Sequence, residues 1–284
     1  MTHIRRKFTT VSAIFRILTA LLAMILTLTC FAACDNGKAP EQSSQSTPKI
    51  DEEGNGGDVS VDAEPKKRVA ITFDDGPQYY NDNETHAIVD ELSKYGFTAT
   101  FFVVGNRISS YDDALTYAVA NGNEIGIHGY THEIYYDTCS DEDYKNEIEK
   151  TLGAIHKILP NYEVKLMRAV GGRITKERVK NSPYAVINWS VDSDDYNNKY
   201  VSGDTDEDTQ RKVETTVNNV MSTVSDGDII LMHDIWSNTY DATVILLQKL
   251  YEEGYEVVSV SELLGDSMKT GREYFSADQY YDYE

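Results

Sequence analysis

The sequence predicts an α/β protein built on a parallel sheet, and three observations support this class. Short apolar runs typical of strands alternate with helical stretches along the chain. Four of the apolar runs end in Asp, in His or in an Asp-rich turn, and the carboxyl ends of parallel strands are where functional groups collect. The alternating part is about 200 residues long, enough for one compact domain with a full core.

The expected elements follow one another in this alternating order. Strands are expected near 68–73, 99–104, 124–128, 163–168, 184–191, 228–232 and 255–258. Helices are expected at 83–95, 111–121, 141–159, 174–180, 206–225 and 240–253. The acids of 140–159 and 204–224 are interpreted mostly as solvated helix faces.

The first strand ends in two adjacent carboxylates. Val69–Phe73 is a short apolar run, and Gly76-Pro77 turns the chain directly after Asp74 and Asp75. Successive side chains of a strand point to opposite faces, but at a turn two acids can share one site and have different roles. A solvated turn would explain this hexapeptide alone equally well, so the interpretation depends on the motifs that follow.

Two histidines four residues apart supply the second observation. His128 and His132 follow the strand-like run 124–127, and His233 follows the run 228–232. Two imidazoles and one carboxylate form a familiar catalytic zinc set. The HxxxH spacing alone is weak, but together with the preceding Asp-Asp turn it predicts a metal site. His86 and His156 fall in helical stretches and are interpreted as structural.

Two further strands end in polar residues. The run 184–191 leads into Asp-Ser-Asp-Asp-Tyr at 192–196, and the run 228–232 ends in His233 and Asp234. Four such strand ends in one α/β domain predict an active-site rim.

The chain resembles the polysaccharide deacetylases, the NodB-homology domain of carbohydrate esterase family four, over about residues 66–265. Five motifs occur in the order typical of that family: TFDDGP at 72–77, HGYTH at 128–132, MRAVGG at 167–172, WSVDSDDY at 189–196 and LMH at 231–233. The resemblance implies a distorted (β/α) barrel of about seven parallel strands, with a metal at their carboxyl ends.

The resemblance also implies a metal set and a base. Asp75, His128 and His132 would bind one divalent metal ion, with Zn²⁺ as the first expectation and Co²⁺ or a similar ion as the alternative. Asp74 would act as the general base that takes a proton from the attacking water. Arg168 would hold Asp74 in place and keep it ionised.

The remaining implied roles concern the oxyanion and the leaving amine. The backbone N–H of Gly171 would stabilise the oxyanion. His233 would protonate the leaving amine, and Asp195 would orient its imidazole and favour the charged form. An ordinary surface ion pair remains the alternative for Arg168.

Three positions depart from the family pattern. Gly129 replaces a Ser or Thr whose hydroxyl would brace the metal loop, Val170 replaces a proline, and Tyr196 replaces a tryptophan. We expect Val170 to loosen the backbone beside the oxyanion donor. Asp192 and Asp194 are interpreted as turn or cap acids. Several aromatic residues flank the motifs and could stack on sugar faces: Tyr130, Tyr135, Tyr136, Tyr196 and Trp236.

The N-terminal segment predicts export. A basic start at 5–7 precedes an apolar stretch from 11 to 33 and small residues before Cys34, which predicts a lipoprotein-type signal peptide over 1–33 and lipidation of Cys34. An uncleaved membrane anchor is the alternative. Residues 34–65 are expected to form a disordered tether. The acidic, Tyr-rich tail 266–284 could be a disordered end or a strap across the domain.

Charge and cysteine content narrow the function classes. Without residues 1–33 the chain has 22 basic and 47 acidic side chains, a net charge of −25. This excludes a nucleic-acid binder, which needs a basic surface, and leaves a lipid or an anchor as the only expected membrane attachment. With Cys34 lipidated, Cys139 would have no partner for an internal disulfide.

The expected function is that of a metal-dependent hydrolase that removes N-acetyl groups from an extracellular polysaccharide, with N-acetylglucosamine of peptidoglycan as the first expectation. O-deacetylation of a xylan-type polysaccharide would use the same groups. A surface glycan-binding module without catalysis is the alternative from a different class. The intact Asp74, Asp75, His128, His132 and His233 favour the enzyme.

Overall fold

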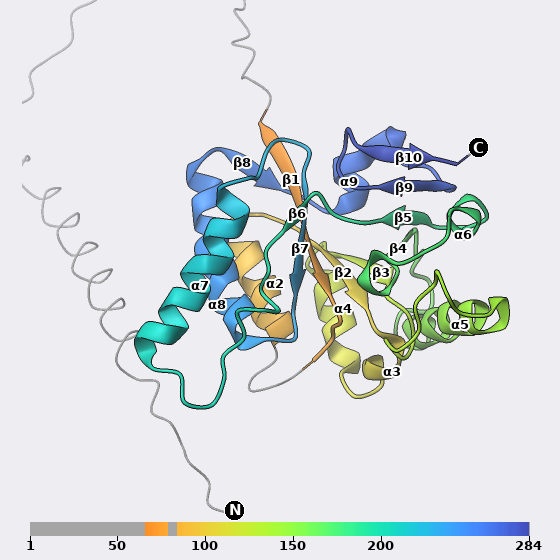
Figure 1. Cartoon of the computed structure of the whole chain (residues 1–284), viewed down its shortest axis with the longest axis horizontal. Coiled ribbons are helices and arrows are strands. Elements are labelled where there is room, and N and C mark those ends of the chain that lie inside the picture. The colour runs from red at the N-terminus through yellow and green to blue at the C-terminus, as the bar shows by residue number, and fades with distance from the viewer. Residues whose placement is uncertain (1–65, 79–83, 284) are drawn as a thin grey trace, which may run out of the picture. The chain divides into compact units, whose positions relative to one another are not determined.

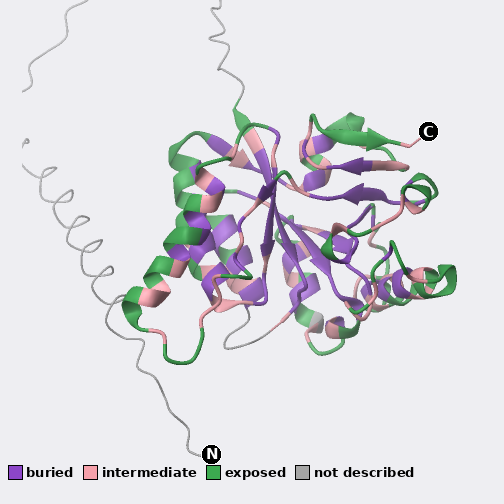
Figure 2. Ribbon diagram, in the orientation of Figure 1, coloured by how far each residue is buried: buried purple, intermediate pink, exposed green. Residues whose placement is uncertain are grey.

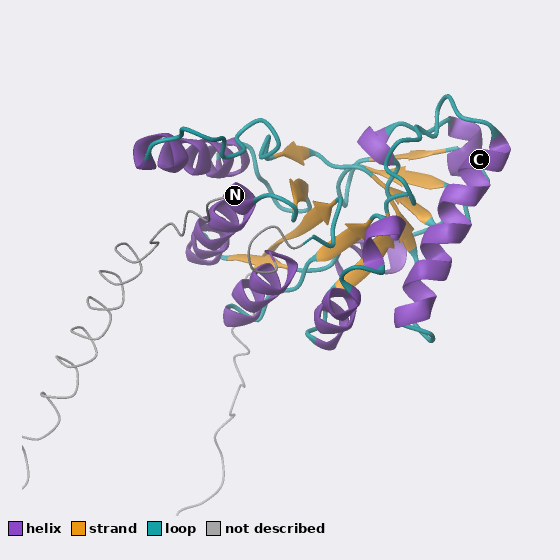
Figure 3. Cartoon of the chain, turned by 90° about the horizontal axis from the view of Figure 1, so that it is seen from below, coloured by secondary structure: helices purple, strands orange, loops and turns teal. Residues whose placement is uncertain are grey.

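A curled, mostly parallel sheet with helices around it forms the domain (Figures 1 and 3). The structure is a computed structural model that describes residues 66–78 and 84–283. The expectations for the signal peptide 1–33, for lipidation of Cys34 and for the tether 34–65 lie outside the described residues.

Ten strands of the described chain belong to one sheet, in the order β10-β9-β5-β4-β3-β2-β1-β7-β6, with β8 paired to β1. The neighbouring strands pair in parallel except β9 and β10. The sheet order ends at β6 and β10, so the barrel is open. The strands are β1 (Lys67–Asp74), β2 (Thr100–Val103), β3 (Glu124–Ile127), β4 (Leu166–Met167), β5 (Ala185–Ile187), β6 (Val191–Asp192), β7 (Ile229–His233), β8 (Tyr255–Val257), β9 (Arg272–Tyr274) and β10 (Tyr280–Asp282).

The helices connect successive parallel strands, as a parallel sheet requires. Side-chain caps fix where two long acidic helices begin. Before Asp141–Ile158, Ser140 accepts a hydrogen bond from the N–H of Asp143, and before Asp206–Met221, Thr205 forms a capping box with Asp208. The helices are α2 (Glu84–Lys94), α3 (Gly105–Ile108), α4 (Asp112–Ala120), α5 (Asp141–Ile158), α6 (Lys176–Lys180), α7 (Asp206–Met221), α8 (Ser237–Glu252) and α9 (Val260–Leu264), with 3₁₀ turns η1 (Val170–Gly172) and η2 (Gly265–Ser267).

The central strand β1 is buried on both faces, as expected for a parallel sheet. Val69, Ile71 and Phe73 belong to the larger apolar cluster, whereas Ala70 belongs to a smaller one on the other side. Figure 2 shows the buried strands enclosed by helices whose outer faces are exposed. The buried packing fixes the strand and therefore the position of the two carboxylates at its end.

The expected α/β class and curled barrel agree with this architecture, but the strand count differs. The predicted strand 184–191 is two strands, β5 and β6. Between them, the N–H of Asn188 bonds to the carbonyl of Tyr274 in β9 at 2.7 Å, and that of Ser190 bonds to Ile229 in β7 at 3.0 Å. The apolar run is continuous in the sequence, but the chain changes its hydrogen-bonding partners within it.

The C-terminal residues 272–282 form a hairpin that extends the sheet. Strand β9 pairs in parallel with β5, and β10 pairs with β9. The turn between them contacts the residues just before β7, because the N–H of Ala277 bonds to the carbonyl of Gly227 at 2.8 Å. Of the two alternatives for the tail, the strap is therefore closer to the structure.

Candidate active site

The ends of two central strands bring the first groups of the site together. Asp74, the last residue of β1, lies opposite His233, the last residue of β7, in the parallel register. Asp75 follows Asp74 with a φ of 76°, a left-handed conformation that is uncommon outside glycine. This turn lets the two neighbouring carboxylates reach the same rim.

Asp75, His128 and His132 gather their ligand atoms within 4.8 Å of one another. The Oδ1 atom of Asp75 lies 2.8 Å from Nε2 of His132 and 3.3 Å from Nε2 of His128. Asp75 and His128 are buried, whereas the His132 side chain is 35% exposed. The set is thus closed on the protein side and open at His132.

The chemistry of these donors fits a metal ion. Nδ1 of His128 lies 3.0 Å from the carbonyl of Arg168. Because a carbonyl oxygen only accepts, Nδ1 carries a proton, and Nε2 is the atom of this ring that can serve a metal. Burial alone would raise the pKa of Asp75, but hydrogen bonds and charge from His128 and His132 hold it well below its usual range. Oδ1 of Asp75 is buried and its near neighbours are the two imidazole nitrogens, so one carboxylate and two histidines converge as a zinc-type ligand set.

Asp74 and Arg168 form a fully buried ion pair. Arg168 is 0% exposed and its Nη1 lies 2.7 Å from Oδ1 of Asp74. Its guanidinium also donates to Thr72 Oγ1 and to the carbonyls of Ile187 and Asn188. Burial lowers the pKa of Arg168, and Asp74 opposes that change. The surface ion pair considered for Arg168 is therefore wrong.

The Asp195–His233 pair lies on the β7 side of β1, whereas Arg168 comes from the side of β2, β3 and β4. Nδ1 of His233 is 2.8 Å from Oδ1 of Asp195, and Oδ2 of Asp195 accepts from the His233 N–H and the Thr239 hydroxyl. Burial disfavours the charged imidazole, but the hydrogen bond and charge of Asp195 outweigh it and raise the pKa of His233 to about 9. His233 is therefore protonated at neutral pH.

The Gly171 segment is a tight turn in η1. Gly171 has a φ of 60°, which a larger residue rarely adopts. A Cβ at this position would lie 3.7 Å from the ring of Tyr135. Val170, which stands where the family has proline, is 2% exposed, so packing supplies part of the rigidity that a proline ring would give.

The loop that contains the two histidines is fixed by a residue that we interpreted as solvated. Glu147 of α5 is 4% exposed, and its carboxylate accepts from the N–H groups of Tyr130 and Thr131 and from the Thr131 hydroxyl. A Cβ at Gly129 would lie 3.1 Å from Oε2 of Glu147. The solvated interpretation of the acidic helix 140–159 is wrong for this residue.

Other supporting residues were also missed. Thr72, Asn188 and Thr239 each contact a predicted site residue through a hydroxyl or a backbone carbonyl. Arg107 of α3 donates to the carbonyl of Asp75. Thr72 belongs to the first motif, but no local pattern marks the other three.

The flanking aromatic residues divide into two groups. Tyr136 is 0% exposed and cannot contact a sugar, so that expectation is wrong. Tyr135 is 43% exposed beside Gly171, and Tyr196 is 38% exposed with its ring 5.6 Å from that of His233. Asp192 accepts from the N–H of Asp194 at 2.8 Å, as expected of a turn acid.

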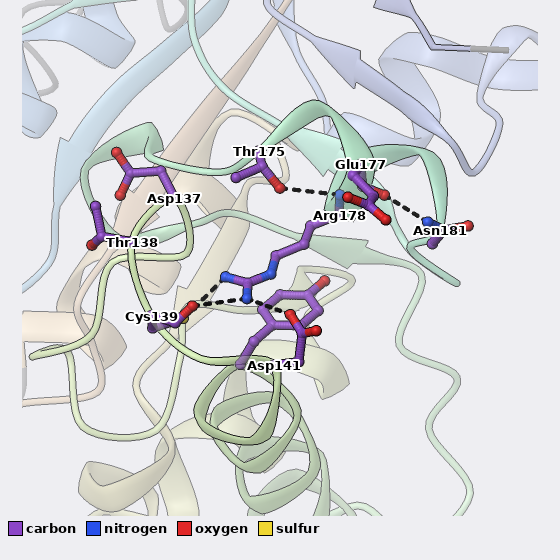
Figure 4. A pocket seen from close by; sticks show the side chains of 9 residues that line it. Asp137, Thr138, Cys139, Asp141, Thr175, Glu177, Arg178 and Asn181 are labelled. Atoms are coloured by element: carbon purple, nitrogen blue, oxygen red, sulfur yellow. Dashed lines mark hydrogen bonds and ion pairs between the residues drawn. The ribbon is translucent and has the colours of Figure 1, made fainter.

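A separate surface pocket lies between the loop before α5 and helix α6 (Figure 4). Arg178 crosses it and donates to the carbonyls of Tyr136 and Cys139 and to the carboxylate of Asp141. No predicted site residue lines this pocket. Its arginine fixes the loop that presents Tyr135.

Comparisons with known proteins agree with the motifs. The family model "Polysaccharide deacetylase" matches residues 62–185. The peptidoglycan-N-acetylmuramic acid deacetylase PdaC of Bacillus subtilis is 35% identical, over 73% of this chain but only 40% of its own length. A peptidoglycan-N-acetylglucosamine deacetylase of Bacillus cereus is 33% identical, over 70% of this chain and 89% of its own. Within the described residues, no helix has both the length and the apolar character needed to cross a membrane.

The fold also matches solved structures. A family 4 acetyl xylan esterase from Clostridium thermocellum, solved in complex with a cobalt ion, is 27% identical with a TM-score of 0.64. The match covers 75% of this chain and all of that one.

Proposed function

Because the chain belongs to the polysaccharide deacetylase family, we propose that it is a metal-dependent hydrolase that removes N-acetyl groups from an extracellular polysaccharide, with N-acetylglucosamine of peptidoglycan as the substrate. One observation carries the proposal. A carboxylate held by a buried arginine and an imidazole held by a buried carboxylate stand side by side in the register, at the ends of β1 and β7. A base and an acid are what hydrolysis of an amide needs.

Asp75, His128 and His132 would hold the cation, with Zn²⁺ as the first choice and Co²⁺ or a similar ion as the alternative. When bound, such an ion polarises the acetyl carbonyl and lowers the pKa of a nearby water. The cobalt ion in the related esterase supports a divalent metal in this family. The exposed side of His132 leaves room for a substrate to approach.

Asp74 would take a proton from the attacking water. One of its oxygens is occupied by Arg168, while Oδ2 lies 3.6 Å from Nε2 of His128, beside the metal set. Arg168 therefore fixes which oxygen is available and keeps the carboxylate directed at the site. The backbone N–H of Gly171 would stabilise the oxyanion that forms.

His233 would donate a proton to the departing nitrogen. An amine is a poor leaving group unless it is protonated, and the raised pKa of His233 keeps the proton available at neutral pH. Tyr135, exposed beside Gly171, and Tyr196, exposed beside His233, would contact the sugar.

Acetate release is the direct test of activity and substrate. Purified protein loaded with Zn²⁺ is incubated in parallel with peptidoglycan, with chito-oligosaccharides and with acetylated xylan. We expect release from peptidoglycan, and an Asp74→Asn variant that binds the metal should lose most of it, by roughly 10²–10⁴-fold. Release from xylan alone would favour the O-deacetylase alternative, and binding to glycans without any release would favour the glycan-binding module.

We further propose that the protein acts at the bacterial cell surface, anchored by a lipid on Cys34. The small residues before Cys34 support this location. Mass spectrometry of the membrane fraction from an expressing bacterium should find a diacylglyceryl group on the residue at position 34. A mature chain that starts elsewhere or is released into the medium would contradict lipidation.

A further inference from the structure

We propose that Glu147 is a positioning residue for the metal site, and that its carboxylate holds the loop between the two histidines in the conformation that binds the cation. The inference rests on the metal site of the proposed function. Burial of a charged carboxylate costs free energy, and Glu147, which is 4% exposed, has lost most of its hydration.

All the donors that compensate Glu147 come from this loop. Oε2 accepts from the N–H groups of Tyr130 at 2.6 Å and Thr131 at 2.9 Å, and Oε1 accepts from the Thr131 hydroxyl at 3.0 Å. These donors are two backbone groups and a hydroxyl, and none of them carries a charge. A buried carboxylate satisfied in this way stabilises one loop conformation rather than an ion pair.

The loop needs such support because its backbone is unusual. Gly129 has a φ of 79° and His132 a φ of 63°, and a left-handed non-glycine residue persists only where its surroundings determine it. The carbonyls of Gly129 and Tyr130 accept from the N–H groups of Gly105 and Asn106. Helix α3 therefore holds the carbonyls of the loop, and Glu147 holds its N–H groups.

Gly129 explains why a carboxylate can take this place. A Cβ there would lie 3.1 Å from both Oε2 of Glu147 and the hydroxyl of Tyr136, tighter than ordinary contact. The side chain that the family usually carries here would crowd Glu147 in its present position. In this chain the brace comes from helix α5 instead of from the loop itself.

Two conservative variants test separately whether the length or the charge of the Glu147 side chain holds the loop. Glu147→Asp keeps the charge but withdraws the carboxylate by one methylene, so the three hydrogen bonds are lost. Glu147→Gln removes the charge but keeps the reach, since its amide oxygen can accept both N–H groups and its NH₂ can donate to the Thr131 hydroxyl. Glu149→Asp is the matched control, because Glu149 lies on the same helix and is exposed.

The measurement is the zinc dissociation constant of metal-free protein, by competition with a chromophoric chelator. We expect Glu147→Asp to bind zinc about 10–100-fold more weakly, as for other residues that orient metal ligands, and Glu147→Gln and Glu149→Asp to stay close to wild type. Wild-type affinity in Glu147→Asp, or an equal loss in Glu147→Gln, would overturn the proposal.

Amide hydrogen exchange in the metal-free protein gives a second readout. The amides of Tyr130 and Thr131 should be protected in the wild type and in Glu147→Gln and should exchange faster in Glu147→Asp, at temperatures where all variants remain folded. Unchanged exchange in Glu147→Asp would contradict the role of Glu147. If the wild type bound no zinc, the proposed metal site would fail, while these exchange rates would still decide whether Glu147 holds the loop.

Discussion

The site contains two carboxylate–cation pairs that look alike in composition and differ in what their charges can do. Asp74 and Arg168 are 3% and 0% exposed, and the arginine makes four hydrogen bonds, one to Asp74 and three to groups around it. Asp195 is also buried, but its partner His233 keeps 14% of its side chain exposed. The guanidinium stays charged at any pH that the protein meets, whereas Asp195 raises the pKa of the imidazole only to about 9, so the imidazole can lose its proton.

This difference assigns different tasks to the two pairs. A permanent cation can orient a base without exchanging protons with it. A histidine that is held charged by a carboxylate can still release its proton to a substrate and recover it. The Asp74–Arg168 pair is therefore suited to support, and the Asp195–His233 pair is suited to proton transfer.

The largest expected effect is that of Arg168→Ala, which would break the first pair. It leaves Asp74 buried without its cation and leaves two backbone carbonyls without donors, so the free energy of unfolding should fall by about 3–5 kcal/mol. Urea unfolding followed by circular dichroism measures this change. Arg173→Ala is the control, because the Arg173 side chain is 45% exposed in its pair with Asp137, and it should change stability by less than about 1 kcal/mol. Equal losses in both variants would contradict a special role for the buried pair.

The next largest effect tests whether His233, in the Asp195–His233 pair, is the acid. His233→Ala should reduce N-deacetylation by roughly 10²–10⁴-fold, because the amine then leaves without its proton. Hydrolysis of an activated acetate ester should fall much less, since that leaving group needs no proton. Rates on both substrates, measured with the same zinc-loaded preparation, give the comparison. If both reactions lost the same factor, His233 would not be the acid.

The smallest expected effect is a shift in the pH profile. Activity that needs protonated His233 should decline as the pH rises through about 9. Asp195→Asn removes the charge that raises this pKa, so the descending limb should move about 1–3 pH units lower. Asp192→Asn is the comparison, because the charge of Asp192 also acts on His233 but its side chain accepts a hydrogen bond from the Asp194 N–H instead, so the limb should move less than in Asp195→Asn. A limb that stays in place in Asp195→Asn would mean that Asp195 does not set the His233 pKa.

Much of the rim could be predicted from the sequence because strand ends are local signals. The apolar run 69–73 and the run 229–232 each end in the residues that the structure brings together, and their parallel pairing follows from the alternation with helices. The left-handed turn at Asp75 completes the first end. For these residues, the order of strands and helices along the chain was enough to predict which side chains lie together.

The supporting residues could not be predicted in this way because their partners are distant. Glu147 shares the buried face of α5 with Ile148, Thr151 and Ile155, whereas Glu149 is exposed. Helical periodicity therefore hints that Glu147 is buried, but it does not show that the partner is the histidine loop. The division of 184–191 into two strands depends on Tyr274 and Ile229, which lie far along the chain. Non-local hydrogen bonds, rather than propensity, decided both outcomes.

The C-terminal hairpin has a consequence for the order in which the chain folds. Asn188, whose carbonyl accepts from Arg168, donates its side-chain amide to Glu273, 85 residues later, at 2.7 Å. Closing a loop of this length costs conformational entropy, and during synthesis the contact cannot form before Glu273 has been added. A nascent chain synthesised only as far as α9 would carry every residue that the five motifs contain. It would still lack the carboxylate that secures Asn188 behind the buried arginine, so Asp74, the proposed base, would acquire its full support only after residue 273 had been made.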